Sequence, residues 1–275
     1  MFCWTTRNTS QCRSPSCRLC RRAAGPTWSG GCSSRWATPW RSPSTRRRPL
    51  VRAALARLIA DEPPADEEEA QPAPERARNL HEQRLEAVLE QLRRSGARSV
   101  ADLGCGEGRL LRLLLPERQF ERILGMDVAY RSLEIARERL RLDRLPPALA
   151  ERLTLIQGSL LYRDARLAGY DAAVVEVVEH LDPARLAAFE RVVFEHARPG
   201  TVVLTTPNAE YNVRFPTLAA GTFRHSDHRF EWSRAEFSAW AERVAAAHGY
   251  RVEVAPIGPE DAEVGAPSQL ARFWR

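Results

Sequence analysis

The feature that most constrains this chain is a regular alternation of short apolar segments and amphipathic segments after Gly96. Strands are predicted where short aliphatic runs occur, at Ser99–Leu103, Arg122–Met126, Leu153–Gln157, Asp171–Val175, Thr201–Thr205 and Tyr250–Val254. Helical spacing predicts helices at Glu107–Leu115, Tyr130–Leu140, Pro183–His196 and Arg234–His248. This alternation indicates an α/β fold with a doubly wound, mostly parallel sheet, in which ligands bind at the carboxyl ends of the strands.

The chain before this region has a different composition. Residues 1–48 contain ten arginines and no acidic residue, without any apolar period, and are interpreted as a disordered or spurious segment. An Arg- and Ser-rich transit peptide is the alternative. Residues 49–78 are interpreted as a helix remnant followed by an acidic, Pro-rich linker. A folded domain is predicted for residues 79–275, beginning with an amphipathic helix.

The charge, the cysteines and the apolar runs argue against a broad nucleic-acid-binding surface, a zinc site at Cys17-x-x-Cys20 and a membrane-spanning segment. The net charge of +6 comes from residues 1–48, because the remainder sets 31 arginines against all 35 acidic residues. Any contact with nucleic acid is therefore expected to be local. Cys17-x-x-Cys20 has no second ligand pair at zinc spacing, and Cys105 alone lies in the predicted domain. This usage predicts a reducing, cytoplasmic compartment, and no apolar run is long enough to cross a membrane.

A glycine-rich loop follows the first predicted strand. It reads Asp102-Leu-Gly104-Cys-Gly106-Glu-Gly108, and the second strand ends in Asp127. The spacing G-x-G-x-G after an acidic residue resembles the S-adenosylmethionine loop of class I methyltransferases with a Rossmann-like fold. Glycines let the backbone approach a ligand, and a carboxylate such as Asp127 can accept both ribose hydroxyls of adenosine. The alternative is a tight turn in another nucleotide-binding protein.

Two further residues are candidates for cofactor contacts. Ser159 and Leu160 follow the third predicted strand, where the adenine lies in this fold. The alternative for Ser159 is an ordinary turn serine.

The segment Glu176-Val-Val-Glu179-His180 follows the fourth predicted strand. If the chain turns helical there, both carboxylates and the imidazole converge on one side. Oxygen and nitrogen ligands of this kind suit Mg²⁺, Mn²⁺ or Zn²⁺. Small-molecule methyltransferases that use no metal carry similar segments, so a further ligand is needed. His225 and His228 lie in a predicted loop after the fifth strand and are candidates, with solvated loop histidines as the alternative.

Three motifs together resemble one family, the RNA 3′-terminal ribose 2′-O-methyltransferases of small-RNA maturation and bacterial RNA repair. The motifs are Glu176-Val-Val-Glu-His180-Leu-Asp-Pro, Thr206-Pro-Asn-Ala-Glu-Tyr211-Asn212 and Asp227-His228-Arg-Phe-Glu-Trp232. The resemblance implies that residues 79–275 are a methyltransferase domain using S-adenosyl-L-methionine. It also implies Mg²⁺ or Mn²⁺ ligated by Glu176, Glu179, His180 and His228, with His180 or His228 as candidate proton shuttles. Asp227 matches the pattern as a neighbour, and His225 has no secure counterpart.

The implied substrate is an RNA 3′ end with free 2′,3′-hydroxyls, because a divalent ion held by both hydroxyls orients the attacking oxygen. Implied partners are an RNA-repair kinase–phosphatase and ligase. Rival functions are a small-molecule O-methyltransferase and a non-catalytic RNA-end-binding subunit of a repair complex. Candidate RNA contacts are Arg214, Arg224, Arg229, Arg234, Tyr211 and Phe215, with ordinary surface positions as the alternative for the arginines. Phe230 and Trp232 are expected in the core.

Overall fold

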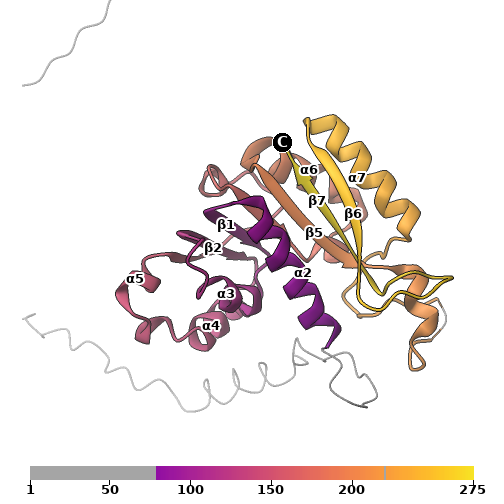
Figure 1. The fold of residues 1–275 in the computed structure, drawn as a ribbon, viewed down its shortest axis with the longest axis horizontal. Coiled ribbons are helices and arrows are strands. Elements are labelled where there is room, and N and C mark those ends of the chain that lie inside the picture. Colours follow the sequence, from indigo (N-terminus) through magenta and orange to yellow (C-terminus); the bar gives the residue numbers. More distant parts are fainter. Residues whose placement is uncertain (1–78, 220) are drawn as a thin grey trace, which may run out of the picture. The chain divides into compact units, whose positions relative to one another are not determined.

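The computed structural model describes residues 79–219 and 221–275 of the chain, so the predictions for residues 1–48 and 49–78 lie outside the described residues. A seven-stranded sheet forms its centre, with strand order β3-β2-β1-β4-β5-β7-β6 (Figure 1). The strands are β1 (Ser99–Leu103), β2 (Arg122–Asp127), β3 (Leu153–Gln157), β4 (Ala172–Val175), β5 (Thr201–Pro207), β6 (Arg251–Ile257) and β7 (Ser268–Trp274). Only β7 runs antiparallel to its neighbours. The predicted doubly wound, mostly parallel sheet is confirmed.

Helices connect these strands. The α-helices are α2 (Leu80–Ser95), α3 (Arg109–Leu114), α4 (Tyr130–Arg139), α5 (Pro147–Ala150), α6 (Leu186–Glu190) and α7 (Arg234–His248). Single turns of 3₁₀-helix are η1 (Leu142–Arg144), η2 (Ala165–Leu167), η3 (Val178–His180) and η4 (Pro183–Arg185); η6 (Ala209–Arg214) is longer, and η5 (Arg191–Ala197) is a π-helix. Within the described ranges, no helix combines the length and the apolar character that a membrane span needs.

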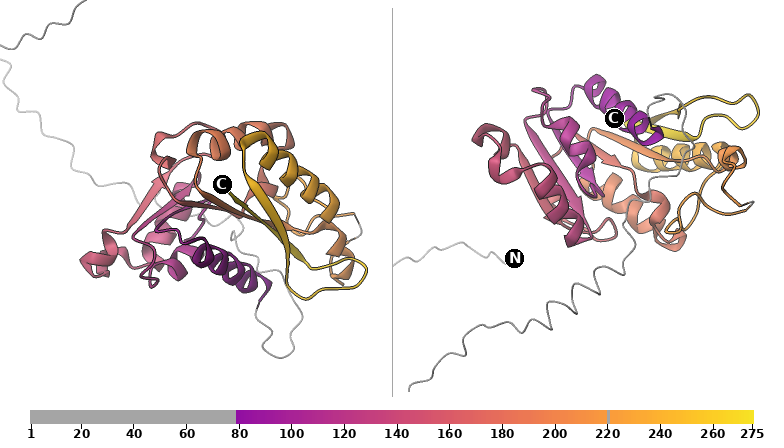
Figure 2. Two further views of the ribbon diagram at one scale, coloured as in Figure 1. Left: turned by 45° about the horizontal axis from the view of Figure 1, so that its top comes forward. Right: turned by 90° about the horizontal axis from the view of Figure 1, so that it is seen from below.

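Alternating strand residues face two helical layers. Val100, Val174 and Val203 belong to a core that includes residues of α2, α3 and α4. Residues on the other face of the same strands, among them Leu103 and Val175, belong to a second core that includes residues of α6, η5 and α7. Figure 2 shows the indigo α2 and the golden α7 on opposite faces of the sheet. The period of two along each strand therefore produces the three-layer architecture.

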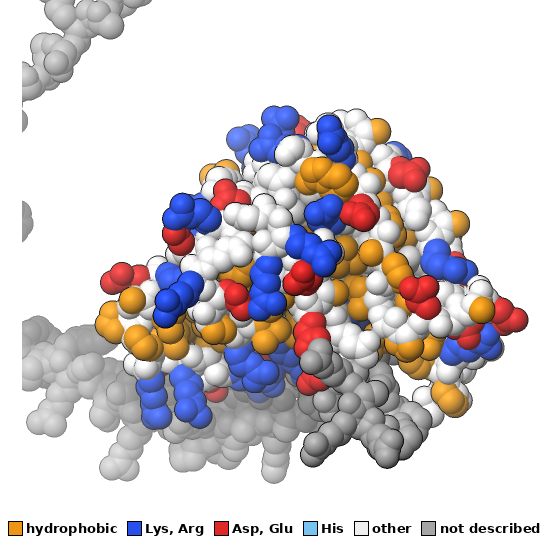
Figure 3. Space-filling model, viewed as in Figure 1, with side chains coloured by type: hydrophobic (Ala, Val, Ile, Leu, Met, Phe, Trp, Pro, Cys, Tyr) orange, Lys and Arg blue, Asp and Glu red, His pale blue; other side chains and the backbone are white. Residues whose placement is uncertain are grey.

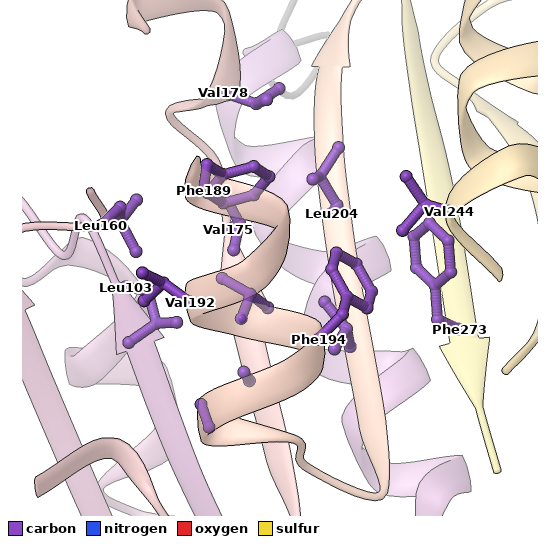
Figure 4. Close-up of a cluster of buried hydrophobic side chains, with 14 of the residues drawn as sticks. Leu103, Leu160, Val175, Val178, Phe189, Val192, Phe194, Leu204, Val244 and Phe273 are labelled. Atoms are coloured by element: carbon purple, nitrogen blue, oxygen red, sulfur yellow. The ribbon is translucent and has the colours of Figure 1, made fainter. Parts of the chain in front are cut away.

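The second core is dominated by aromatic and aliphatic side chains. Phe194 of η5 lies against Phe273 of β7, with ring centroids 4.9 Å apart, and beside Leu204 of β5 (Figure 4). Phe189, Phe194, Phe237 and Phe273 are all fully buried. This packing fixes the position of β4 and β5, whose carboxyl ends bear the motifs of interest.

Two elements differ from the sequence prediction. The helix expected over Pro183–His196 is divided into η4, α6 and the π-helix η5, because Arg198 N–H closes back on the carbonyl of Val193 and widens the last turns. Strand β7 was missed. Its sequence mixes Ser268, Gln269 and Arg272 with apolar residues and shows no alternation, since five of its seven residues are buried on one face or the other.

Candidate active site

The loop between β1 and α3 is built for close approach by a ligand. Gly104 and Gly106 have φ angles of 96° and 49°, a region that favours glycine. The N–H groups of Gly104 and Cys105 both donate to the carbonyl of Met126, at 2.7 and 3.0 Å. A Cβ atom at Gly104 would lie 2.5 Å from a methyl carbon of Val177. The glycine loop therefore lies directly against the segment that contains Glu176 and Glu179.

Two carboxylates beside this loop each have a buried oxygen atom without a hydrogen-bond partner among the described residues. Asp102 is 3% exposed, and its Oδ2 atom has no hydrogen-bond partner among the described residues; the same holds for Oε1 of Glu176. Burial raises the pKa of Asp102 well above its usual range, and the charges of Glu176 and Asp127 raise it further. Burial also raises the pKa of Glu176, while Arg84 of α2 acts in the opposite direction. Buried acceptors of this kind fit a cationic ligand, such as the ammonium and sulfonium of S-adenosylmethionine.

The other predicted cofactor residues lie at the same edge of the sheet. Oδ2 of Asp127 accepts the N–H of Gly106 at 2.8 Å, and Oδ1 accepts the N–H of Ala129 at 2.8 Å. Asp127 thus holds the glycine loop against the end of β2. Oγ of Ser159 accepts the N–H of Leu161 at 3.2 Å, which is the turn arrangement, and Leu160 is buried.

The carboxyl ends of β4 and β5 bring together three potential metal ligands. One ligand atom each from Glu179, His180 and His228 lies within 4.8 Å of the others. Burial raises the pKa of the Glu179 carboxyl to about 7. His180 is exposed at the surface, and partial desolvation together with the imidazoles of His228 and His225 lowers its pKa to about 4. A neutral imidazole offers a lone pair, and a buried carboxylate is stabilised by a cation. The donor set fits a divalent ion with carboxylate and imidazole ligands.

Glu231 orients His228. Nδ1 of His228 lies 2.5 Å from Oε1 of Glu231, and the two side chains are 8% and 0% exposed. Although burial opposes ionisation, hydrogen bonds from His228, Asn212 and the N–H of Arg224 keep the pKa of Glu231 below its usual value. An ionised Glu231 therefore accepts a hydrogen bond from Nδ1–H and leaves Nε2 with a free lone pair, which is the arrangement of carboxylate–histidine–metal triads.

The main chain of Asp227 orients the other imidazole. His180 donates a hydrogen bond to the backbone carbonyl of Asp227. In addition, the N–H of Arg229 donates to the carbonyl of Glu179 at 2.8 Å. These bonds hold the loop of residues 224–232 to η3, although the two segments are about fifty residues apart. Asp227, which the sequence predicted only as a neighbour of the ligands, therefore orients His180 through its peptide groups.

Glu176 lies outside the group of three ligand atoms. It follows Val175, the last residue of β4, and precedes the turn of η3, whose N-cap is Val177. The helical turn therefore begins too late to bring Glu176 into the group with Glu179 and His180. Its charge instead raises the pKa of Asp102, so the carboxyl of Glu176 lies near that of Asp102.

Most of the candidate RNA-binding arginines contact protein. Arg214 pairs with Asp261 at 2.9 Å and Glu263 at 2.7 Å, and Arg234 pairs with Glu210 at 2.6 Å.

Arg224 stabilises the loop itself. Its Nε donates to Asn212 at 2.9 Å, and its guanidinium lies 4.8 Å from the centre of the Phe215 ring. Arg229 is exposed. Phe230 and Trp232 pack against the second core, as expected from the sequence.

The sequence predicted no role for Glu231 and Thr206 of this site, and it left His225 as a candidate without an assigned role. Glu231 orients His228, Oγ1 of Thr206 donates to Glu179 at 3.3 Å, and His225 lies beside both other imidazoles. The spacing His-x-x-Glu in a predicted turn was the available signal for Glu231, because residues i and i+3 of a turn lie close together.

The fold and this site define a class I, S-adenosylmethionine-dependent methyltransferase domain. Residues 101–203 match the family model described as methyltransferase domain. A crystal structure of the methyltransferase domain of bacterial CtHen1 is 50% identical, covers 72% of this chain and 100% of that one, and superposes with a TM-score of 0.66. The chain belongs to the Hen1 methyltransferase family.

Curated and structural relatives extend beyond bacteria. The small RNA 2′-O-methyltransferase of Mus musculus is 41% identical over 211 residues, which are 71% of this chain and 51% of that protein. A crystal structure of the small RNA methyltransferase HEN1 is 33% identical, covers 74% of this chain and 28% of that one, and has a TM-score of 0.66. The chain spans about half the length of the mouse relative.

Proposed function

We propose that this protein transfers the methyl group of S-adenosylmethionine to the 2′-hydroxyl of the 3′-terminal nucleotide of RNA, with a divalent metal ion in the site. The observation that carries the proposal is the group formed by Glu179, His180 and His228, two of which lie on the segment whose Val177 packs against Gly104 of the glycine loop. The names of the relatives support methylation of an RNA 2′-oxygen. The carboxylate and imidazole side chains support a bound metal ion. Such an ion, held by two adjacent hydroxyls, supports the 3′-terminal nucleotide as the one that is methylated.

The proposed ligands have separate tasks. Glu179, His180 and His228 would hold the metal ion, and Glu176 remains the predicted fourth ligand. The carboxylate ligands suit Mg²⁺ or Mn²⁺, and the two imidazole ligands favour Mn²⁺. When bound, the ion would lower the pKa of a ribose hydroxyl and orient it. His180 and His228 remain candidates to carry the released proton away.

The cofactor residues place the methyl donor. Asp102 would accept hydrogen bonds from the ammonium group of S-adenosylmethionine, and Asp127 would accept those of the ribose hydroxyls. The cofactor supplies an electrophilic methyl group on a sulfonium. Since Val177 packs against Gly104, cofactor and acceptor oxygen would be neighbours, as an in-line transfer requires.

RNA recognition is proposed to be local. Acidic and basic side chains are interspersed over the face shown in Figure 3, without one broad basic field. Arg229 is exposed beside the ligand group, whereas Arg214 and Arg234 are paired with carboxylates. Recognition by the terminal hydroxyls, with few phosphate contacts, agrees with this distribution. An RNA-repair kinase–phosphatase or ligase and a cytoplasmic location remain predictions.

Periodate protection tests the proposal. Purified protein is incubated with S-adenosylmethionine carrying a labelled methyl group, Mn²⁺ or EDTA, and short RNAs ending in 2′,3′-hydroxyls or in a 3′-phosphate, and both label transfer and periodate resistance are measured. The hydroxyl-ended RNA is expected to become resistant to periodate only with metal, because 2′-O-methylation removes the vicinal diol. Methyl transfer that persists in EDTA, or that reaches the 3′-phosphate RNA equally well, would contradict the proposal. Cofactor binding without turnover would favour the non-catalytic RNA-end binder.

A further inference from the structure

His225 lies beside the proposed metal ligands at one end of a turn. The N–H of His228 donates to the carbonyl of His225 at 3.2 Å, so these residues occupy the two ends of the turn. Their rings lie 5.7 Å apart between centroids, and the rings of His225 and His180 lie 6.1 Å apart. Among the described residues, the group of mutually close ligand atoms includes His180 and His228 and excludes His225.

Hydrogen bonding assigns His225 the opposite tautomer from His228. The N–H of Asp227 donates to Nδ1 of His225 at 3.1 Å, which uses the lone pair of that nitrogen. A neutral imidazole carries one proton, so this proton is assigned to Nε2 of His225. In His228, Nδ1 carries the proton because it faces Glu231. Nε2 is therefore a lone pair in His228 and an N–H donor in His225.

A donor at this position can bind a substrate oxygen. The side chain of His225 is 34% exposed, and its Nδ1 accepts a hydrogen bond within the turn, which leaves Nε2 as the nitrogen for a ligand. In the complex of the proposed function, two hydroxyl oxygens of the terminal ribose would lie beside the ligand group. A donor to the 2′-oxygen would draw electron density from the nucleophile and oppose its attack. A donor to the 3′-oxygen carries no such penalty.

We infer that His225 donates its Nε2–H to the 3′-hydroxyl oxygen of the terminal nucleotide and is a specificity-determining residue for free 3′ ends. This inference rests on the proposed function and adds a contact made by the protein itself. Recognition of the 3′-hydroxyl then has two contributions. One is the proposed metal ion held by Glu179, His180 and His228, and the other is the hydrogen bond from His225.

Inhibition by unreactive RNA ends tests the contact without chemistry. Two RNAs that lack the 2′-hydroxyl are compared as competitive inhibitors, one with a terminal 3′-hydroxyl and one with a 2′,3′-dideoxy end. For the wild type, loss of the 3′-hydroxyl is expected to weaken inhibition. For His225→Leu, the ratio of the two inhibition constants is expected to shrink by about tenfold, which is the contribution of one hydrogen bond. His225→Gln, whose amide nitrogen can replace Nε2 as a donor, is expected to recover most of the ratio.

Controls separate this role from metal binding and folding. Mn²⁺ affinity of His225→Leu is expected to remain within about twofold of the wild type. His196→Leu, in η5 rather than in the loops of the site, is expected to leave the inhibition ratio unchanged. An unchanged ratio in His225→Leu, or a tenfold loss of Mn²⁺ affinity, would overturn the inference. Absence of methyl transfer by the wild type would instead overturn the proposed function.

Discussion

His228 and His225 are three residues apart, and their hydrogen-bond partners direct Nε2 to different chemistry. The carboxylate of Glu231 leaves a lone pair on His228, and the peptide N–H of Asp227 leaves a proton on His225. A sequence shows two histidines in a loop but not the partners of their ring nitrogens. The chemistry at the residue scale therefore depends on tertiary contacts that the motif alone does not reveal.

The role of Glu231 can be tested by removing its charge. Glu231→Gln keeps an acceptor near Nδ1 of His228 but removes the charge that raises the basicity of the imidazole. Mn²⁺ affinity is therefore expected to fall by about tenfold or more. Calorimetric titration with Mn²⁺ measures the change. Glu263→Gln is the matched control, because Glu263 is 80% exposed and pairs with Arg214 away from the ligand group. Equal Mn²⁺ affinity of Glu231→Gln and the wild type would show that Glu231 does not orient a ligand.

Asp102 provides a prediction about pH. Burial, with Glu176 and Asp127, raises the pKa of Asp102, so the folded protein without ligand binds a proton there more tightly than the unfolded chain does. The stability contribution of Asp102 is thus fully present below the usual carboxyl pKa and is lost as the pH rises through the raised pKa. Asp102→Asn is therefore expected to raise the melting temperature relative to the wild type, and more so as pH increases.

The same substitution is expected to weaken cofactor binding. S-adenosylmethionine is cationic at its reactive end and favours ionised Asp102, so affinity for the wild type should increase with pH. In Asp102→Asn the affinity should be lower and this pH dependence smaller. Calorimetric titrations over a pH series test both points, with Asp143→Asn in η1 as control. A variant that is both less stable and unchanged in cofactor affinity would refute this account of Asp102.

At the scale of elements, the sequence predicts those strands whose bounds follow from hydrophobic periodicity. Strands β1 and β3 have the predicted bounds, and the end of β4 at Val175 was also predicted. The strand order places these ends at one edge, and the glycine loop and the Glu-x-x-Glu-His segment therefore meet as expected. Strand β7 was missed because its polar residues are buried by neighbours far away in sequence; Gln269, for example, donates to the carbonyls of Pro207 and Trp232.

The candidate site was predictable in part for the same reason. Glu179, His180 and His228 come together, whereas the position of Glu176 depends on where the turn of η3 begins. That start depends on main-chain contacts such as the hydrogen bond between Arg229 and Glu179. Local spacing does not encode such a bond.

The helical layer over β5 and β7 is expected to be essential for stability. Phe194→Ala would leave a cavity between Leu204 and Phe273 and should lower the free energy of unfolding by about 3–5 kcal/mol. Val213→Ala is the control, because Val213 is 75% exposed and should change stability by less than about 0.5 kcal/mol. Chemical denaturation measures both variants. A loss below about 1 kcal/mol in Phe194→Ala would show that this core closes around the missing ring.

At the scale of the whole molecule, one sheet edge carries the glycine loop and the proposed metal-ligand group, and Val177 links them by packing against Gly104. Neither half alone distinguishes the proposed enzyme from its rivals, since a small-molecule methyltransferase needs only the loop. The combination, held together by Gly104 against Val177, suits an acceptor with two adjacent hydroxyls. Only the terminal nucleotide of an RNA chain offers both.

The position of the transferred methyl group tests this claim most directly. An RNA of defined sequence with a unique 3′-terminal nucleotide is methylated with Mn²⁺, digested to nucleosides and analysed by mass spectrometry. The account predicts one 2′-O-methyl group per RNA, on the terminal nucleoside alone, whatever the length of the chain. Methyl groups on internal nucleosides, on a base, or in numbers that increase with RNA length would contradict it.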